Sequence, residues 1–154
     1  MTILQVLSCI GLIILLINTR LYFVGFAKNG KAYKTFFLYL LCIFILQVTM
    51  QVYALENINN HYLSTYYLFF NFILLSAFFY YLFAGLGNRV GVFIKYIGII
   101  VVSGLAMQYI RNPDLYYTFN PIGFLITSSL LIVYSVLYLF ELVSNKVSYT
   151  YITA

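Results

Sequence analysis

The sequence predicts an all-α fold, a polytopic transmembrane helical bundle with five spans in one domain, residues 1–154. Hydrophobic residues make up 64% of the chain and charged residues only 7%, whereas a soluble domain has about 25% charged residues. Five apolar runs are long enough, at about 1.5 Å per residue, to cross a hydrocarbon layer of about 30 Å. Lipid offers the backbone no hydrogen-bond partners, so each run is expected to be helical.

The first three spans are separated by short polar stretches. The first is expected over residues 3–26, with Arg20 snorkelling towards an interface, and the turn at Asn29-Gly30 follows it. The next two, residues 35–55 and 62–83, form a hairpin around ENINNH. Neither contains Asp, Glu, Lys or Arg. This hairpin is the clearest transmembrane signal in the chain.

The last two spans are bounded by glycine and proline. The loop AGLGNRVG precedes a span over residues 92–110, and RNPDLYYTFN precedes a span over residues 121–143. Pro121 suits a first helical turn. The tail SNKVSYTYITA is short and polar, and we expect it to be poorly ordered.

The basic residues are distributed unequally between the two sides of the predicted membrane. Seven lie on one side, namely Arg20, Lys28, Lys31, Lys34, Arg89, Lys95 and Lys146. Only Arg111 lies on the other. Positive charge favours the cytoplasm, so five spans predict an N-terminus outside and a C-terminus inside.

All five spans place hydrogen-bonding side chains in the outer leaflet. The candidate ligand-binding cluster consists of Gln47, Gln51, Asn71, Ser103, Thr127 and Ser128. Other polar residues expected at this depth are Gln5, Ser8, Gln108 and Ser129. Two interpretations stay open: hydrogen bonds that join helices, or a hydrated pocket open to the outside. The first predicts that Gln47 and Asn71, at similar depth in the hairpin, bond to each other.

Lys95 and Glu141 lie about one turn inside adjacent spans at matching depth, which predicts an ion pair or two snorkelling side chains. His61 is the only histidine, and Cys9 and Cys42 are interpreted as small buried hydrophobic residues. We therefore predict no metal site, no cofactor and no catalytic residue. No basic patch interleaved with aromatic residues indicates nucleic acid as a partner.

Two stretches are rich in Tyr and Phe, namely ENINNHYLSTYYLFFNFILLSAFFYYLF and LIVYSVLYLFELVSN. In the first, an Asn-Asn loop precedes an aromatic span that itself contains an asparagine. Over about Gly30 to Asn145 the chain resembles aromatic-rich multi-span membrane proteins of Bacteroidota that have no assigned activity. The resemblance implies a fold and no chemistry. A bacterial inner membrane is the expected location.

The expected function is that of a non-enzymatic sensor-like or scaffold component of the membrane that works with partners. Those partners are the lipid bilayer and either further copies of the chain or a larger membrane complex. One alternative is a subunit of an oligomeric channel or small-solute carrier, with the outer-leaflet polar cluster as its vestibule. A second is an accessory subunit of a larger membrane complex. A membrane enzyme acting on lipid is disfavoured by a single histidine and three acids.

Overall fold

The structure is a computed structural model that describes residues 3–56, 58–87 and 89–152, with side chains described over 6–56, 58–87 and 89–144. Its elements are α1 (Ile3–Gly25), α2 (Lys31–Leu55), α3 (His61–Gly85), α4 (Val90–Arg111), the short 3-10 helix η1 (Pro113–Tyr116) and α5 (Pro121–Ile152). The described residues form helices and no strands. Each of the five α-helices is long and apolar enough to cross a membrane. The predicted all-α fold with five spans is confirmed.

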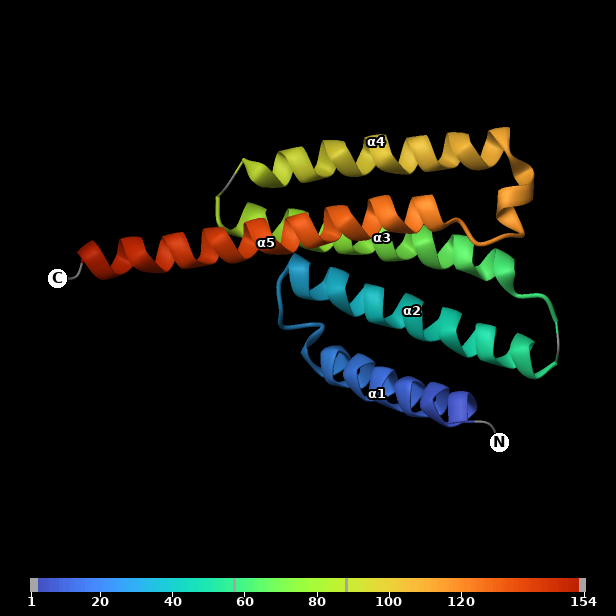
Figure 1. The fold of residues 1–154 in the computed structure, drawn as a ribbon. Helices are drawn as coiled ribbons and strands as arrows, with labels where there is room; N and C mark the ends of the chain where they lie inside the picture. Colours follow the sequence, from blue (N-terminus) through green and yellow to red (C-terminus); the bar gives the residue numbers. More distant parts are fainter. Residues whose placement is uncertain (1–2, 57, 88, 153–154) are drawn as a thin grey trace.

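The five helices run antiparallel to their sequence neighbours (Figure 1). In the order α1, α2, α3, α4 each helix packs on the next, and α5 packs against α3 with a smaller contact to α4. Among the described helices, α1 contacts only α2. The arrangement is therefore an open row centred on α3, with α1 at one edge.

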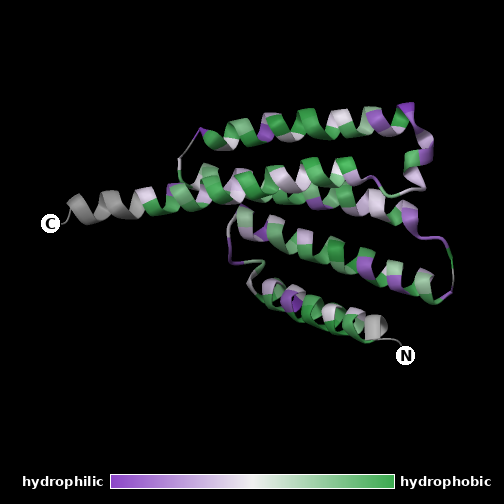
Figure 2. Ribbon diagram, in the orientation of Figure 1, coloured by the Kyte–Doolittle hydropathy of each residue, from purple (hydrophilic) through white to green (hydrophobic). Residues whose placement is uncertain are grey.

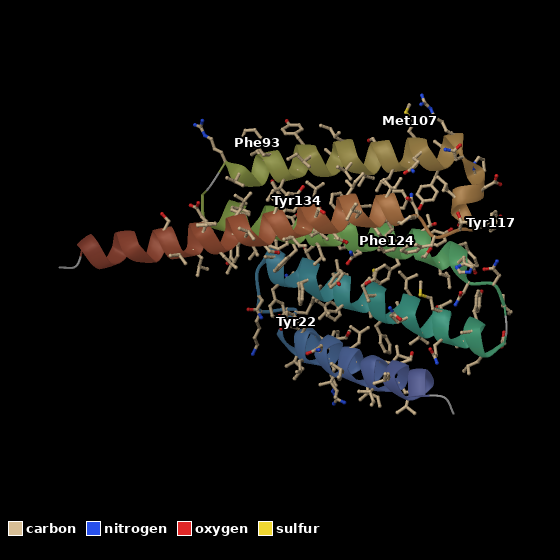
Figure 3. The ribbon with its side chains drawn as sticks, in the orientation of Figure 1. Tyr22, Phe93, Met107, Tyr117, Phe124 and Tyr134 are labelled. Carbon is tan, nitrogen blue, oxygen red and sulfur yellow. The ribbon has the colours of Figure 1, made fainter. Side chains whose placement is uncertain are left out.

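The core lies where α3 meets α4 and α5. Leu68 and Phe72 of α3 are fully buried, and Phe83 packs with Ile94 of α4 and Tyr134 of α5. Figure 3 shows Tyr134 in the middle of the bundle, with Phe93 projecting outward from α4. Large apolar side chains on the outer faces suit contact with lipid acyl chains, where exposure carries no hydrophobic cost.

The bundle has two chemically distinct ends, and the polar residues gather there and in the loops (Figure 2). The end with the α1–α2 and α3–α4 loops carries Arg20, Lys28, Lys31, Lys34 and Arg89, and is termed the basic end. The opposite end, with the α2–α3 loop and η1, is termed the η1 end. The two chain termini lie at opposite ends (Figure 1).

The structure corrects the expectation for the tail. α5 does not end at Val143 but continues to Ile152, beyond the ends of the other helices (Figure 1). No glycine or proline follows Val143 in the helix, so nothing in the backbone stops it. Residues 153–154 of the expected tail lie outside the described residues. In the α3–α4 loop, Gly87 adopts φ +70°, a conformation that glycine takes at no steric cost.

Candidate functional site

The predicted polar cluster does not converge on one cavity within the chain. Gln51 bonds to α1, because the Ser8 hydroxyl donates to its Oε1 at 2.8 Å. Gln47 lies in a groove between α1 and α2. Asn71 is half-buried on α3 and does not hydrogen-bond Gln47. The structure thus joins α1 to α2 through Ser8 and Gln51, and the predicted hydrogen bond between Gln47 and Asn71 within the hairpin does not form.

The remaining members of the cluster lie in three other places. Thr127 is fully buried, and its hydroxyl donates to the carbonyl oxygens of Gly123 at 2.9 Å and Phe124 at 3.2 Å. Ser128 is exposed on the outer face of α5, and Ser103 is exposed beside a second groove between α3 and α4. A vestibule formed by all six residues of the cluster is therefore not assembled in a single chain.

The groove between α1 and α2, termed the α1–α2 groove, has a volume of about 390 Å³. Its lining includes Ser8, Gly11, Leu15, Asn18, Ile43 and Gln47. Asn18 lies about 10 Å from the basic end of α1 and Gln47 about 12 Å from the η1 end of α2, as the helical rise per residue places them. Both amides therefore lie within the depth of the hydrocarbon layer.

Asn18 and Gln47 differ from the hydroxyl residues around them. Thr19, next to Asn18, is buried and donates to the Leu15 carbonyl oxygen at 2.7 Å. Asn18 is exposed and Gln47 is half-buried, and no described residue hydrogen-bonds either side chain. A side-chain amide has two N–H donors and an acceptor, so the α1–α2 groove presents unpaired hydrogen-bonding groups at membrane depth.

Asn120 is a functional candidate that sequence reasoning missed. Its side chain is 2% exposed. Its Oδ1 accepts from the Gly123 backbone N–H at 2.9 Å, and its Nδ2 donates to Gln108 Oε1 at 3.2 Å and Tyr109 Oη at 3.4 Å. The sequence does hold a signal, because asparagine directly before a helix-starting proline is a typical N-cap. These bonds fix the end of α4 against the start of α5.

Tyrosines gather at the η1 end. Tyr62 and Tyr66 of α3 contact Tyr116 of η1 through their rings. The Tyr116 hydroxyl donates to the Tyr66 hydroxyl, and this hydrogen bond is the largest cause that raises the pKa of Tyr116 to about 12. Amphipathic aromatic rings of this kind are enriched where a helix leaves the hydrocarbon layer, so the cluster marks an interface.

The second groove lies between α3 and α4 and is termed the α3–α4 groove. It too has a volume of about 390 Å³, and its lining is almost entirely apolar, with Lys95 towards the basic end. Glu141, the predicted partner of Lys95, is half-buried on α5 and is not among the groove residues. The ion pair between them stays a prediction.

The titratable residues form no recognisable metal centre in the described part of the chain. No group of three or more His, Cys, Asp or Glu residues there could hold a metal ion. Cys9 and Cys42 are half-buried free thiols on α1 and α2. His61 is exposed at the start of α3, where its backbone N–H donates to Asn59 Oδ1 at 3.0 Å.

No protein-family model, curated protein or solved structure matches the chain. Five helices of sufficient length and apolarity make it a small multi-pass integral membrane protein. Two lateral grooves on the described part of the chain depart from plain lipid-facing helix, one lined by unpaired amides and one by apolar side chains with a lysine.

Proposed function

We propose that the protein is a non-enzymatic scaffold of a bacterial inner membrane, which holds a transmembrane helix of a partner polypeptide in its α1–α2 groove. The observation that carries the proposal is the pair of unpaired amides, Asn18 and Gln47, in that groove. Lipid tails offer no hydrogen-bonding partner to an amide. A partner helix with polar side chains at the depths of these two amides does.

The open edge of the bundle supports the same role. Among the described helices α1 contacts only α2, and most of its surface is uncovered, so a further helix has access to the groove without displacing any other. Gly11 adds no side chain to the groove, and a Cβ there would meet nothing within 4 Å. Small residues allow the backbones of membrane helices to approach closely.

The expected strength of this attachment is modest. Hydrogen bonds between membrane helices average about 0.6 kcal/mol and reach about 1.7 kcal/mol. Two amides would therefore contribute about 1–3 kcal/mol, or roughly a fivefold to hundredfold gain in association. Packing along the groove supplies the remainder. Such an affinity suits a component that assembles with a partner in the plane of the membrane.

The proposed orientation places the N-terminus outside and the C-terminus in the cytoplasm. The basic end gathers five of the chain's Lys and Arg residues on α1, α2 and the two connecting loops. Lys and Arg near the ends of spans are retained on the cytoplasmic side. Reporter fusions after Lys34, His61, Arg89 and Asp114 should then alternate, with the first cytoplasmic. A periplasmic signal after Lys34 would reverse the proposed orientation.

A photocrosslinking residue in the groove tests the scaffold function. Placed at Ile14, which lines the groove, it should give a discrete protein adduct in membranes of the source cells. Leu16 is an equally exposed residue of α1 outside the groove, and the same probe there should give none. The adduct from Ile14 should disappear when Asn18 and Gln47 are both replaced by leucine.

The channel or carrier alternative predicts a different result. Copies of the chain would line a water-filled path with their groove amides, so the probe at Ile14 would crosslink only to the chain itself. Purified protein in liposomes would then pass a small polar solute, and the Asn18→Leu, Gln47→Leu variant would not. Either result would replace the scaffold proposal.

A further inference from the structure

The α3–α4 groove extends over the half of the bundle that lies nearer the basic end. On α4 it runs from Ile94 to Ser103, and on α3 from Tyr80 to Phe72. The helical rise makes each stretch about 12–14 Å long, starting about 6–8 Å from the basic end of each helix. One leaflet contributes about 15 Å of a 30 Å hydrocarbon layer. The length and depth of the groove therefore match a single leaflet.

The floor of the groove is open because Gly98 has no side chain there. A Cβ at Gly98 would meet only the Ser76 Cβ, at 3.8 Å, so the two helices approach closely below the groove. Ile73 and Ile99 line the groove and are exposed at its sides. The groove thus opens towards the lipid rather than into the bundle.

One polar atom of the groove has no partner. The Ser76 side chain is only 7% exposed, and its Oγ hydrogen-bonds no described atom. The hydroxyls of Thr35 and Ser135 instead donate to carbonyl oxygens one turn earlier in their helices. Leaving a buried hydroxyl without a partner is unfavourable, because the group has lost its bonds to water and gained none in the protein. Ser76 lines the groove, so a turn of its side chain would bring this unpartnered hydroxyl to an acceptor there.

We propose that the α3–α4 groove binds one anionic phospholipid of the leaflet at the basic end. An acyl chain lies along the apolar floor, the ester carbonyl accepts from Ser76 Oγ, and the phosphate lies against the Lys95 ammonium. Ser76 lies about 6 Å deeper than Lys95, as the helical rise places them, which is the order of ester and phosphate in a phospholipid. This site is on a different face from the α1–α2 groove and does not depend on it.

Charge favours a lipid over a second copy of the chain as the occupant. Basic pockets between transmembrane helices are known to bind anionic headgroups. The chain has only three acids, and Glu56 and Asp114 both lie at the η1 end. A helix from a second copy would therefore bring at most Glu141 to Lys95, whereas an anionic lipid always brings its phosphate.

Native mass spectrometry of the purified full chain with added phosphatidylglycerol or phosphatidylcholine tests the charge requirement. The chain should retain one phosphatidylglycerol with about fivefold preference, because a basic residue is worth about that factor near an anionic headgroup. Lys95→Gln should abolish the preference. The matched control, Lys28→Gln, removes the same charge from an exposed loop at the basic end and should leave it unchanged. Equal retention of both lipids by the unmodified chain would overturn the proposal.

Two further variants test the groove and the competing ion pair. Gly98→Leu fills the floor and should lower the retention of both lipids, whereas Gly104→Leu, on the same helix outside the groove, should not. Glu141→Gln should leave the preference for phosphatidylglycerol intact. A preference that appears only after Glu141→Gln would show that Lys95 is held by Glu141, and would overturn the lipid site. A dimer that Gly98→Leu dissociates without changing lipid retention would assign the groove to a second copy.

Discussion

Replacing Asn120 by alanine should lower the free energy of unfolding by about 2 kcal/mol, because it removes the hydrogen bonds that hold the end of α4 against the start of α5. The loss of the N-cap hydrogen bond to the Gly123 N–H costs about 1 kcal/mol. The loss of the two bonds to Gln108 and Tyr109 costs about 0.6 kcal/mol each. The side chain is 2% exposed, so water does not replace these bonds. The change should lower the free energy of unfolding without altering the number of helices.

Two control variants divide this loss between the cap and the network. Asn120→Ser keeps a cap acceptor but removes the amide donor, so it should cost about 1 kcal/mol, or half of the alanine effect. Asn112 is exposed and its side chain caps no helix, so Asn112→Ala should change stability by less than about 0.5 kcal/mol. Unfolding in mixed micelles with increasing SDS, followed by circular dichroism, measures all three. Equal stability of Asn120→Ala and Asn112→Ala would refute the buried network.

The remaining predictions concern a hydrogen bond, a helix contact and a titration. In a double-mutant cycle, Ser8→Ala and Gln51→Leu should show a coupling of about 0.6 kcal/mol, and strict additivity in the same unfolding assay would exclude their bond. Gly91→Ala should lower the free energy of unfolding, because a Cβ there would lie 3.2 Å from a backbone oxygen of α3. Gly98→Ala should be tolerated, since the nearest atom to its Cβ would lie 3.8 Å away. The pKa of Tyr116 is raised from the usual 10.0 to about 12, so the folded state favours the neutral phenol. The contribution of this phenol to the stability of the fold is therefore complete below pH 10 and is lost as the pH rises through 12. Tyr66→Phe should return this pKa towards 10, and an unchanged ultraviolet titration, with Tyr116→Phe as the blank, would exclude the hydrogen bond.

The spans were predictable because the physical constraint on them is strong. An apolar run of about 20 residues in lipid has no alternative to a helix, and the loops carry the charges and the Asn-Gly and Asn-Pro turns that separate the runs. The sequence predicted that Ser8 and Gln51 lie in the same leaflet, and in the structure a hydrogen bond joins their side chains. Depth follows directly from position in a helix.

The order in which the helices pack was not predictable. α3 and α4 are apolar around their whole circumference, so no stripe of hydrophobic residues marks the face that meets a neighbour. The sequence therefore holds no sign that α3 lies at the centre and that α2 is the single contact of α1 among the described helices. The sequence predicted the depth of Gln47 on α2 but not that its side chain lines a groove with α1.

The local features that were missed have identifiable causes. Asn120 was interpreted only as a mark of the loop, although its place before Pro121 is a capping signal. The continuation of α5 to Ile152 was missed because polarity was taken as a sign of disorder. Polarity moves a helix out of the hydrocarbon layer without breaking it, and no residue after Val143 is a glycine or proline, the two weakest helix formers.

The most direct test of the scaffold account is the accessibility of three polar positions to water. Cysteine replaces Gln47, Gln51 or Asn71, one at a time, in a chain whose Cys9 and Cys42 have been changed to alanine. An impermeant thiol reagent is added to intact cells from outside, which the proposed topology makes the η1 side, with Asn59→Cys in the exposed α2–α3 loop as the positive control.

The account predicts rapid labelling at Asn59→Cys and protection at the other three, because Gln51 is bonded to Ser8, Gln47 faces a partner helix, and Asn71 lies half-buried on the central helix α3. Rapid labelling of all three intramembrane cysteines would contradict it. Water would then reach the polar residues of the outer leaflet, and the protein would be a channel or carrier subunit.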